Sequence, residues 1–298
     1  MDRERHLTHR TSPPSPALEV VARWPVGRAA VGVVRSGSGP AGVEVTEQTG
    51  DADVSFPWAS VTKLLVAMAV LVAGEEGTLG LDDPAGPPGS TVRHLLAHAS
   101  GLGPDSATPL TAPGRRRIYS NIGYELLAEF VSQRSGMPFS DYLRTGVVLP
   151  LQMTATVLPP GASPASGARG PLRDLLALAA ELLAPRLVSP ATLAGATSVA
   201  FGGLAGVLPG FGRFDPCDWG LGFEVRDAKV PHWTGTRNSP ATFGHFGRSG
   251  SFLWVDPVAH LACAGLCDRA FGPWAIEAWP VLADAVVARW GGAGPERA

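Results

Sequence analysis

The sequence predicts an α/β (α+β) fold in which strands from both ends of the chain form one antiparallel sheet flanked by helices. Two observations predict it: strand-like runs lie near both ends of the 298 residues, and helical patterns fill the middle. The middle should therefore form a mostly helical lobe inserted into the sheet. We expect one domain over residues 17–298, with a sheet lobe at about 17–60 and 218–298 and a helical lobe at about 61–217.

The amino-terminal part predicts a tip followed by a β-hairpin. Residues 1–16 are mostly polar and lack the apolar stretch of a secretory signal, so we expect a disordered tip and a cytoplasmic protein. Residues 29–35 and 42–48 are β-branched runs separated by a Gly-Ser-Gly-Pro turn at 37–40. They predict two paired strands with alternating apolar faces.

An apolar run from Leu64 to Ala73 follows Ser60 and Lys63. It predicts a helix buried on all sides, ended by Gly74, and is too short for a membrane span, which needs about 20 apolar residues. Ser60 and Lys63 lie one turn apart on the same face. They could be an N-cap and a solvated charge. Burial and the positive helix end would instead lower the lysine pKa, which would make it a general base beside a serine nucleophile.

Residues 91–102 predict a short helix capped by Thr91 and ended by Gly101. His94 and His98 are four residues apart and share a face, which would allow them to bind zinc. The glutamate of the metalloprotease pattern is missing between them, and no third ligand is evident nearby. We therefore expect no metal site and no cofactor.

A second polar segment, Tyr119-Ser120-Asn121, closes a loop before a predicted helix at 125–135. Considered alone, Asn121 would cap this helix and Tyr119 would pack against it. The preceding arginine triplet, residues 115–117, could bind phosphate, but three charges on a loop usually face solvent.

The second half of the chain predicts helices, loops and late strands. Helices are expected within 137–149, at 172–183 and at about 274–290, and Gly- and Pro-rich irregular segments at 159–170 and 184–215. Successive antiparallel strands are expected at 219–225, 242–244, 251–255 and 260–266.

The composition narrows the kinds of partner. Charge is nearly balanced, with 24 Lys and Arg against 26 Asp and Glu, and the basic residues are scattered. We therefore expect no binding to nucleic acid or membranes. The 3 cysteines lie late in the chain and are expected to be buried free thiols. The sequence leaves the oligomeric state open.

Three motifs occur in order: Ser60-x-x-Lys63 at a helix start, Tyr119-Ser120-Asn121 on a loop, and Gly244-His245-Phe246-Gly247 at a late strand. With their flanking segments they resemble the serine β-lactamase and penicillin-binding protein superfamily, in particular its class C branch with related esterases and D-amino-acid peptidases. The resemblance runs from about Val31 to the C-terminus and implies a β-lactamase/transpeptidase-like fold.

The resemblance also implies roles for the first two motifs. Ser60 would attack a carbonyl carbon and form an acyl-enzyme, and Lys63 would help to remove the serine proton. Tyr119 would carry a proton to the leaving group, with its pKa lowered by the neighbouring ammonium. Asn121 would orient Lys63 and the substrate.

The third motif would shape the substrate pocket. The backbone N–H groups of Ser60 and Arg248 would form an oxyanion hole. Gly247 would allow the substrate to approach the strand. His245 would line the pocket, unless it is a strand histidine satisfied by solvent.

Two departures shape the expected substrate, a small ester or amide. Phe246 stands where the resembled family usually has a hydroxyl residue that helps to bind a carboxylate, and Phe246, Trp58 and Trp254 would suit an apolar acyl pocket or belong to the core. Members that hydrolyse antibiotics or act on the cell wall work outside the cytoplasm, whereas no export signal is seen here. We therefore expect a cytoplasmic esterase or amidase.

Three alternatives remain open. The protein could be a β-lactamase or D-Ala-type peptidase exported from a longer precursor. It could be an acyltransferase, in which a nucleophile other than water takes the acyl group. It could also be a catalytically idle relative that serves as a binding protein, although the presence of Ser60, Lys63, Tyr119 and Asn121 argues against this.

Overall fold

A computed structural model describes residues 15–37 and 42–292. Residues 1–14 of the tip predicted at 1–16 therefore lie outside the described residues. Residues 38–40 of the turn predicted at 37–40 also lie outside them. Pro16 already begins the short helix α1 (Pro16–Glu19), which is followed by a 3-10 turn at Val20–Arg23.

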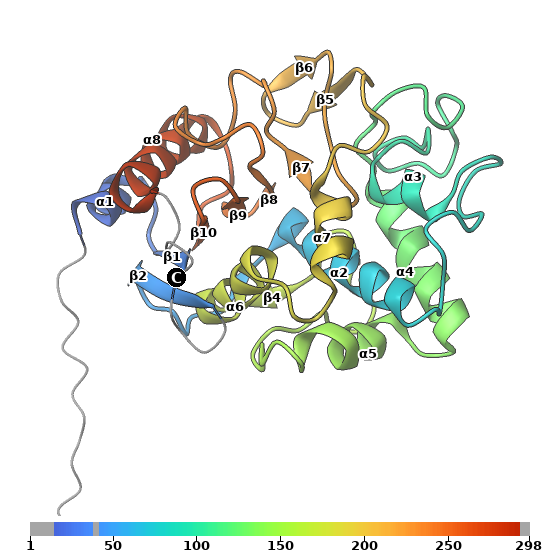
Figure 1. Cartoon of the computed structure of the whole chain (residues 1–298), viewed down its shortest axis with the longest axis horizontal. Coiled ribbons are helices and arrows are strands. Elements are labelled where there is room, and N and C mark those ends of the chain that lie inside the picture. The colour runs from blue at the N-terminus through green and yellow to red at the C-terminus, as the bar shows by residue number, and fades with distance from the viewer. Residues whose placement is uncertain (1–14, 38–41, 293–298) are drawn as a thin grey trace, which may run out of the picture.

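A six-stranded antiparallel sheet forms one side of the molecule (Figure 1). Its order is β2-β1-β10-β9-β8-β7, so the hairpin near the start of the chain pairs with a strand near the end, with Ala29 opposite Cys267. This confirms the prediction of a sheet built from both chain ends. The strands are β1 (Ala29–Ser36), β2 (Val43–Thr49), β7 (Glu224–Val225), β8 (Phe243–Gly247), β9 (Ser251–Asp256) and β10 (Leu261–Cys267).

Helices cover both faces of this sheet. On one face, α6 (Leu172–Leu183) packs on β1 and β10; on the other lie α1 and α8 (Pro273–Trp290) (Figure 1). The side chains of β1 alternate as period-2 geometry requires: Val31 and Val33 join the core under α8, whereas Val34 joins the core under α6. Gly32 allows α6 to pack closely, since a Cβ there would lie 2.7 Å from Leu176 Cδ1.

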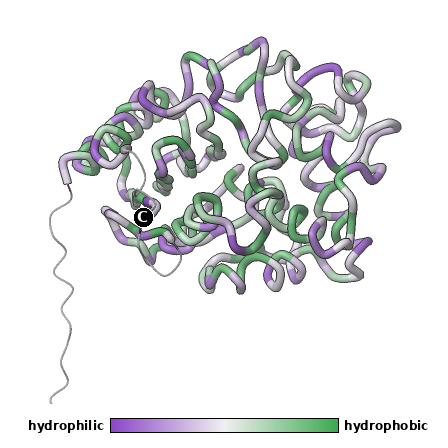
Figure 2. Tube along the Cα trace, viewed as in Figure 1, coloured by the Kyte–Doolittle hydropathy of each residue, from purple (hydrophilic) through white to green (hydrophobic). Residues whose placement is uncertain are grey.

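Helix α2 (Thr62–Glu75) runs through the middle of the molecule. Every residue from Thr62 to Ala73 is buried, as predicted, although the helix continues through Gly74. Much of α2 is hydrophobic in Figure 2, whereas the outer loops carry many hydrophilic residues. The remaining helices surround it: α3 (Val92–Leu96), α4 (Asn121–Ser135), α5 (Phe139–Leu143), a π-helical turn (Arg144–Val148) and α7 (Pro190–Thr197).

Two expectations for local structure are wrong, those for 184–215 and for 219–225, whereas 159–168 is irregular as expected. Residues 184–215, expected to be irregular, contain α7 and the hairpin of β5 (Gly206–Leu208) and β6 (Gly212–Phe214). The start of α7 has the usual signals, Ser189 as N-cap and Pro190 in the first turn. Residues 159–170 are held in place because β4 (Arg169–Gly170) pairs with β3 (Phe56–Pro57). Only the last two residues of 219–225 form a strand.

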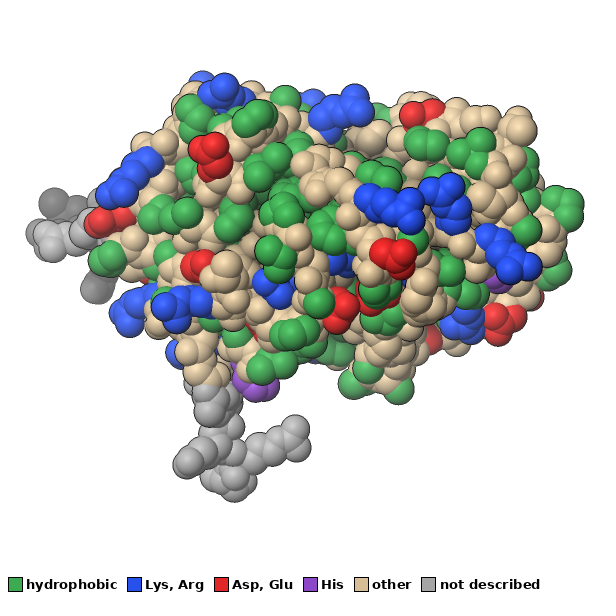
Figure 3. Space-filling view, turned by 90° about the horizontal axis from the view of Figure 1, so that it is seen from above, with side chains coloured by type: hydrophobic (Ala, Val, Ile, Leu, Met, Phe, Trp, Pro, Cys, Tyr) green, Lys and Arg blue, Asp and Glu red, His purple; other side chains and the backbone are tan. Residues whose placement is uncertain are grey.

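The surface seen in Figure 3 carries basic, acidic and hydrophobic side chains intermixed. Within residues 15–37 and 42–292, no helix is both long and apolar enough to cross a membrane. Cys217, Cys263 and Cys267 are buried free thiols, as predicted.

Candidate active site

The proposed nucleophile lies on a tight turn immediately before α2. Ala59, Ser60 and Val61 form a 3-10 turn, and Ala59 has a left-handed φ of +44°, which is unusual for a residue with a side chain. Two hydrogen bonds fix the turn from outside: Ser251 Oγ donates to the Trp58 carbonyl at 2.6 Å, and the Trp58 indole donates to the Gly170 carbonyl at 3.1 Å. Ser60 itself is half-buried, so its hydroxyl is held at a fixed place next to a cavity.

Lys63, the second residue of α2, is fully buried one helical turn after Ser60. Its Nζ donates to Asn121 Oδ1 at 2.7 Å and to the Ala165 carbonyl at 2.9 Å. Burial lowers the lysine pKa to about 7, and the negative charges of Glu125 and Asp105 partly oppose that shift. In a substantial fraction of the molecules Lys63 is therefore a neutral amine at neutral pH, and only this form can act as a general base.

Tyr119 lies close to both Ser60 and Lys63. Its ring centre is 4.7 Å from Lys63 Nζ, and its side chain forms a hydrogen bond with Ser60. Burial raises the phenol pKa well above its usual value, and the Ser60 hydrogen bond and the Arg248 charge counteract only part of that shift. The expected lowering by a neighbouring ammonium is therefore wrong, because loss of water around the phenol outweighs it. The resting side chain is a neutral phenol, which can donate a proton.

Asn121 has both ends of its amide occupied. Its Oδ1 accepts from Lys63, while its Nδ2 donates to Asp105 Oδ1 at 2.7 Å. The expected role of Asn121 as cap of this helix is instead taken by Ser120. The Ser120 Oγ accepts a hydrogen bond from the Gly123 N–H at 3.1 Å. Sequence motifs did not indicate Asp105, because it lies on an exposed loop with no flanking pattern.

The end of β8 packs directly against the nucleophile turn. A Cβ on Gly247 would lie 2.5 Å from the Trp58 carbonyl oxygen and 2.4 Å from Ser251 Oγ. The glycine is thus required by contact within the protein, and its expected role in the approach of the substrate stays a prediction. Strand β7 pairs only with Phe243 and Gly244, so it does not cover the edge of β8 beyond Gly244.

A cavity of about 800 Å³ opens beside Ser60. This volume is in the range of small-molecule sites. Its wall is mixed: Leu208, Trp219, Phe246 and Phe271 form apolar parts, and polar side chains that include Asn121, Glu224 and Arg248 line the rest. Of the aromatic residues expected at a pocket, only Phe246 lines it, since Trp58 and Trp254 are fully buried in the core. Trp219 lines the cavity although the sequence analysis did not select it.

All eight residues selected from the motifs contribute to this region. Ser60, Tyr119, Asn121, His245, Phe246 and Arg248 line the cavity, Lys63 lies behind Tyr119, and Gly247 joins β8 to the nucleophile turn. The residues come from three parts of the chain: the start of α2, the loop before α4, and β8.

Two further buried side chains support the segment that carries Tyr119. Arg117 is buried, contrary to the expectation of a solvent-facing triplet, and its guanidinium donates to four backbone carbonyls, those of Ala97, Ala200, Phe201 and Cys217. His98 is also buried, and its ring centre lies 4.6 Å from that of Tyr119. Its Nδ1 accepts from the Ser120 N–H at 3.1 Å, so it supports the loop. Over the described residues, no cluster of three His, Cys, Asp or Glu side chains could hold a metal.

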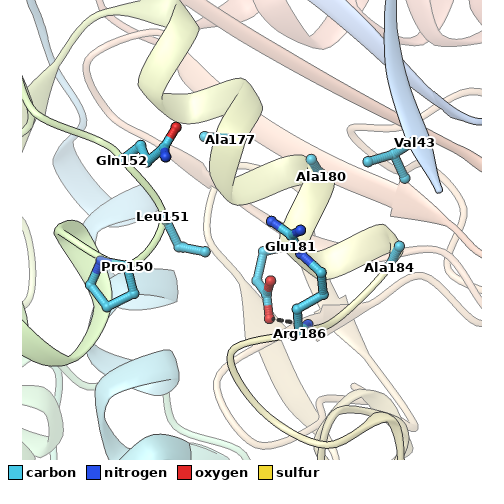
Figure 4. Close-up of a pocket in the computed structure, with 9 residues that line it drawn as sticks. All are labelled: Val43, Pro150, Leu151, Gln152, Ala177, Ala180, Glu181, Ala184 and Arg186. Atoms are coloured by element: carbon cyan, nitrogen blue, oxygen red, sulfur yellow. Dashed lines mark hydrogen bonds between the residues drawn. The ribbon is translucent and has the colours of Figure 1, made fainter. Parts of the chain in front are cut away.

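A second, smaller cavity lies elsewhere, between β2, α6 and residues 150–152 (Figure 4). Its volume is about 250 Å³. Its buried acid, Glu181, accepts hydrogen bonds from the backbone N–H groups of Arg186 and Leu187 at 2.9 and 2.7 Å. This carboxylate therefore fixes the turn after α6, and the chemistry of the molecule is concentrated around Ser60.

The sequence profile of the β-lactamase family matches residues 26–287. The chain belongs to the β-lactamase family. This family comprises serine hydrolases, and the match covers the sheet, the helical part and every candidate site residue. Membership confirms the resemblance to the serine β-lactamase and penicillin-binding protein superfamily.

Individual known proteins show different degrees of similarity to the chain. A β-lactamase structure from Mycobacterium bovis is 52% identical, with a TM-score of 0.88 over 93% of this chain and 100% of that one. Penicillin-binding protein 4* of Bacillus subtilis (strain 168) is 31% identical over 34% of this chain and 30% of its own length. EstCE1, described as a hydrolase with promiscuous acyltransferase activity, shares the fold at 19% identity, with a TM-score of 0.71 over 91% of this chain and 96% of that one. The chain spans about a third to a half of the length of the first curated relatives that it matches.

Proposed function

We propose that this β-lactamase family member is an esterase or amidase that acts through an acyl-enzyme on Ser60. The observation that carries the proposal is the state of Lys63: a buried amine with a pKa of about 7, next to the phenol that is hydrogen-bonded to Ser60. A serine hydroxyl is a weak nucleophile unless a neighbouring base takes its proton. The side chains around Ser60 supply that base.

The acylation step follows from these positions. Ser60 Oγ attacks the carbonyl carbon, and its proton passes through the Tyr119 hydroxyl to the neutral Lys63 amine. The oxyanion that forms would be bound by the backbone N–H groups of Ser60 and Arg248. The proton then returns from Lys63 through Tyr119 to the leaving oxygen or nitrogen, the carbon–leaving-group bond breaks, and Ser60 keeps the acyl group. Water releases the acid by the same steps in reverse.

The apolar part of the cavity wall supports a small substrate that carries an apolar portion. Phe246 is 8% exposed and lies in an aromatic cluster with Phe271, at 5.0 Å between ring centres. At position 246 a phenylalanine ring therefore stands where a hydroxyl residue of related enzymes would help to bind a substrate carboxylate. A cytoplasmic location stays part of this proposal. Because a β-lactamase and a penicillin-binding protein are among the relatives, the alternative function is that of an enzyme that reacts with penicillin.

Intact-protein mass spectrometry tests the proposal. The wild type and Ser60→Ala would be incubated with a fluorophosphonate, a series of p-nitrophenyl esters and a penicillin. We expect a Ser60-dependent fluorophosphonate adduct and turnover of short esters, without a lasting penicillin adduct. Rapid turnover of penicillin, or a stable adduct with it, would favour the alternative function. An absence of any Ser60-dependent adduct would leave a non-catalytic binding role, and accumulation of acyl-enzyme that only an added alcohol releases would indicate acyl transfer.

A further inference from the structure

Most polar side chains around the cavity already have partners within the protein. Glu224 lines the cavity, but its Oε1 accepts from Lys229 at 2.7 Å and its Oε2 accepts from His232 and Trp233, each at 2.9 Å. Asn121 is occupied at both ends, as described above. These groups are fixed by the fold and have little hydrogen-bonding capacity left for a substrate.

His245 differs from them. It lines the cavity from β8 and is only 3% exposed, and its Nε2 has no hydrogen-bond partner in the part of the chain that the structure describes. A buried polar atom without a partner costs free energy, so such atoms are uncommon unless a ligand or water completes them. Its place beside the nucleophile indicates that the missing partner is part of the substrate.

The hydrogen bond on the other side of the ring fixes what Nε2 can do. His245 Nδ1 lies 2.7 Å from the Phe246 carbonyl oxygen. A carbonyl only accepts, so Nδ1 carries the proton, and the Nε2 of a neutral imidazole is then an acceptor. Burial and the nearby Lys63 charge lower the His245 pKa to about 3, which keeps the ring neutral. The site therefore offers a neutral hydrogen-bond acceptor at this position. A cation at the same position would instead attract a carboxylate.

The position of His245 indicates which half of the substrate it meets. Its ring centre is 5.8 Å from that of Tyr119 and 5.5 Å from that of Trp219. In the proposed mechanism Tyr119 returns the proton to the leaving group, so His245 lies on the leaving-group side. Arg248 is the cation at the cavity rim, and because its side chain is exposed it attracts anions only weakly.

We propose that His245 makes the enzyme select esters or amides whose leaving group carries a hydrogen-bond donor, a hydroxyl or an N–H, over those that carry a carboxylate. This selection rests on the proposed esterase function and adds the substrate class to it. A donor completes the buried acceptor, whereas a carboxylate places a second acceptor against it and loses its own hydration.

Four aryl acetates with meta-substituents test the selection: phenyl, 3-hydroxyphenyl, 3-methoxyphenyl and 3-carboxyphenyl acetate. The hydroxy and methoxy esters differ in one donor and have leaving phenols of similar acidity. We expect the wild type to show a kcat/KM about three to ten times higher for the hydroxy ester than for the methoxy ester, the range of one neutral hydrogen bond. The carboxy ester should be the poorest of the four.

Two variants assign the preference to His245. His245→Phe keeps a ring but removes the acceptor, so the hydroxy-to-methoxy ratio should fall to about one. His245→Lys replaces the acceptor with a cationic donor, so the carboxy ester should become better than the hydroxy ester. A ratio taken within one enzyme is independent of the fraction of protein that is folded.

The outcomes separate this inference from the function on which it rests. A wild-type ratio near one overturns the selection even if neither variant folds, and so does a ratio that His245→Phe leaves unchanged. A wild-type preference for the carboxy ester also overturns it. Failure of the proposed function gives a different result, in which none of the four acetates is hydrolysed in a Ser60-dependent way.

Discussion

Lys63 Nζ and Asn121 Oδ1 lie 2.7 Å apart, and this contact joins the buried helix α2 to the first residue of α4. The same asparagine is held from its other side by Asp105. The lysine amine is therefore aimed by a chain of fixed groups, and its low pKa comes from a helix that is buried on all sides. Burial of α2 thus has a chemical consequence as well as a structural one.

Replacement of Lys63 by arginine tests the general-base role. Arginine keeps the positive charge but stays protonated at any pH at which proteins are folded, so it cannot accept the Ser60 proton. We expect Lys63→Arg and Lys63→Ala both to lower the acylation rate by about 10²–10⁴-fold. Single-turnover labelling by a p-nitrophenyl ester measures this rate. Acylation at the wild-type rate in Lys63→Arg would show that the lysine acts only through its charge.

The pH dependence of acylation should follow the Lys63 amine. Its pKa of about 7 lies below that of an ordinary lysine, and only the neutral form accepts a proton, so kcat/KM should rise from pH 5 to pH 8 with a midpoint near 7. Glu125 and Asp105 stabilise the ammonium form. Neutralising either one should therefore lower the pKa and move the midpoint to lower pH.

Asp105→Asn and Glu125→Gln keep the shape of each side chain and remove its charge. Glu129→Gln is the matched control, because Glu129 lies one turn further along α4 on the exposed surface. Profiles of kcat/KM against pH for the three variants would measure the shifts. A midpoint that moves upward in Asp105→Asn would contradict the electrostatic argument.

Tyr119→Phe tests proton transfer to the leaving group. The phenol is protonated at neutral pH because burial raises its pKa, so the hydroxyl can relay a proton but does not act as a phenolate base. Loss of the hydroxyl should slow acylation by about 10²–10⁴-fold, and more for esters with poor leaving groups than for p-nitrophenyl esters. Equal losses for good and poor leaving groups would place Tyr119 outside the proton-transfer step.

Linear motifs predicted the residues that meet at this cavity, because Ser60 and Lys63 are one helical turn apart and the segment 119–121 lies at the start of a helix. What the sequence could not reveal depends on contacts between distant segments. Arg117 looked like one of three solvent-facing charges, yet it binds carbonyls near residues 97, 200 and 217.

The environment of each group was likewise hidden from the sequence. A lysine next to Tyr119 predicted a lowered phenol pKa, but the sequence does not show how completely other segments exclude water from that ring. The sheet was predictable because β1 and β2 are rich in Val and Thr, and because β9 and β10 are apolar runs bounded by turns. The short strands β3 to β6 were not, because each has two or three residues and depends on its partner for its shape.

Gly247→Ala tests whether close packing of β8 positions the nucleophile. A methyl group there would overlap the Trp58 carbonyl and Ser251 Oγ, so β8 and the turn at Ser60 must move apart. Displacements of about 1 Å can cost about 100-fold in rate, and we expect a loss of that order in kcat/KM. Gly195→Ala in α7 is the control, because a Cβ there meets no atom within 4 Å. Wild-type activity in Gly247→Ala would contradict the packing argument.

Glu224→Gln tests the buried polar cluster behind the cavity. Burial opposes ionisation of Glu224, but the charges of His232 and Lys229 outweigh it and hold its pKa at about 2. Removing the carboxylate leaves Lys229 buried without its counterion, so the free energy of unfolding at pH 7 should fall by about 3–5 kcal/mol. Urea denaturation measures it, with the exposed Glu277→Gln as the control.

The same pair of proteins gives a pH test with a definite sign. A carboxylate whose folded pKa lies below its ordinary value of 4.5 stabilises the fold above pH 4.5 and loses that contribution as the pH falls toward 2. The stability difference between wild type and Glu224→Gln should therefore shrink as the pH falls from 4.5 toward 2. A difference that grows on acidification would mean that the carboxyl is protonated in the folded protein, and that the cluster is held by neutral hydrogen bonds instead of by charge.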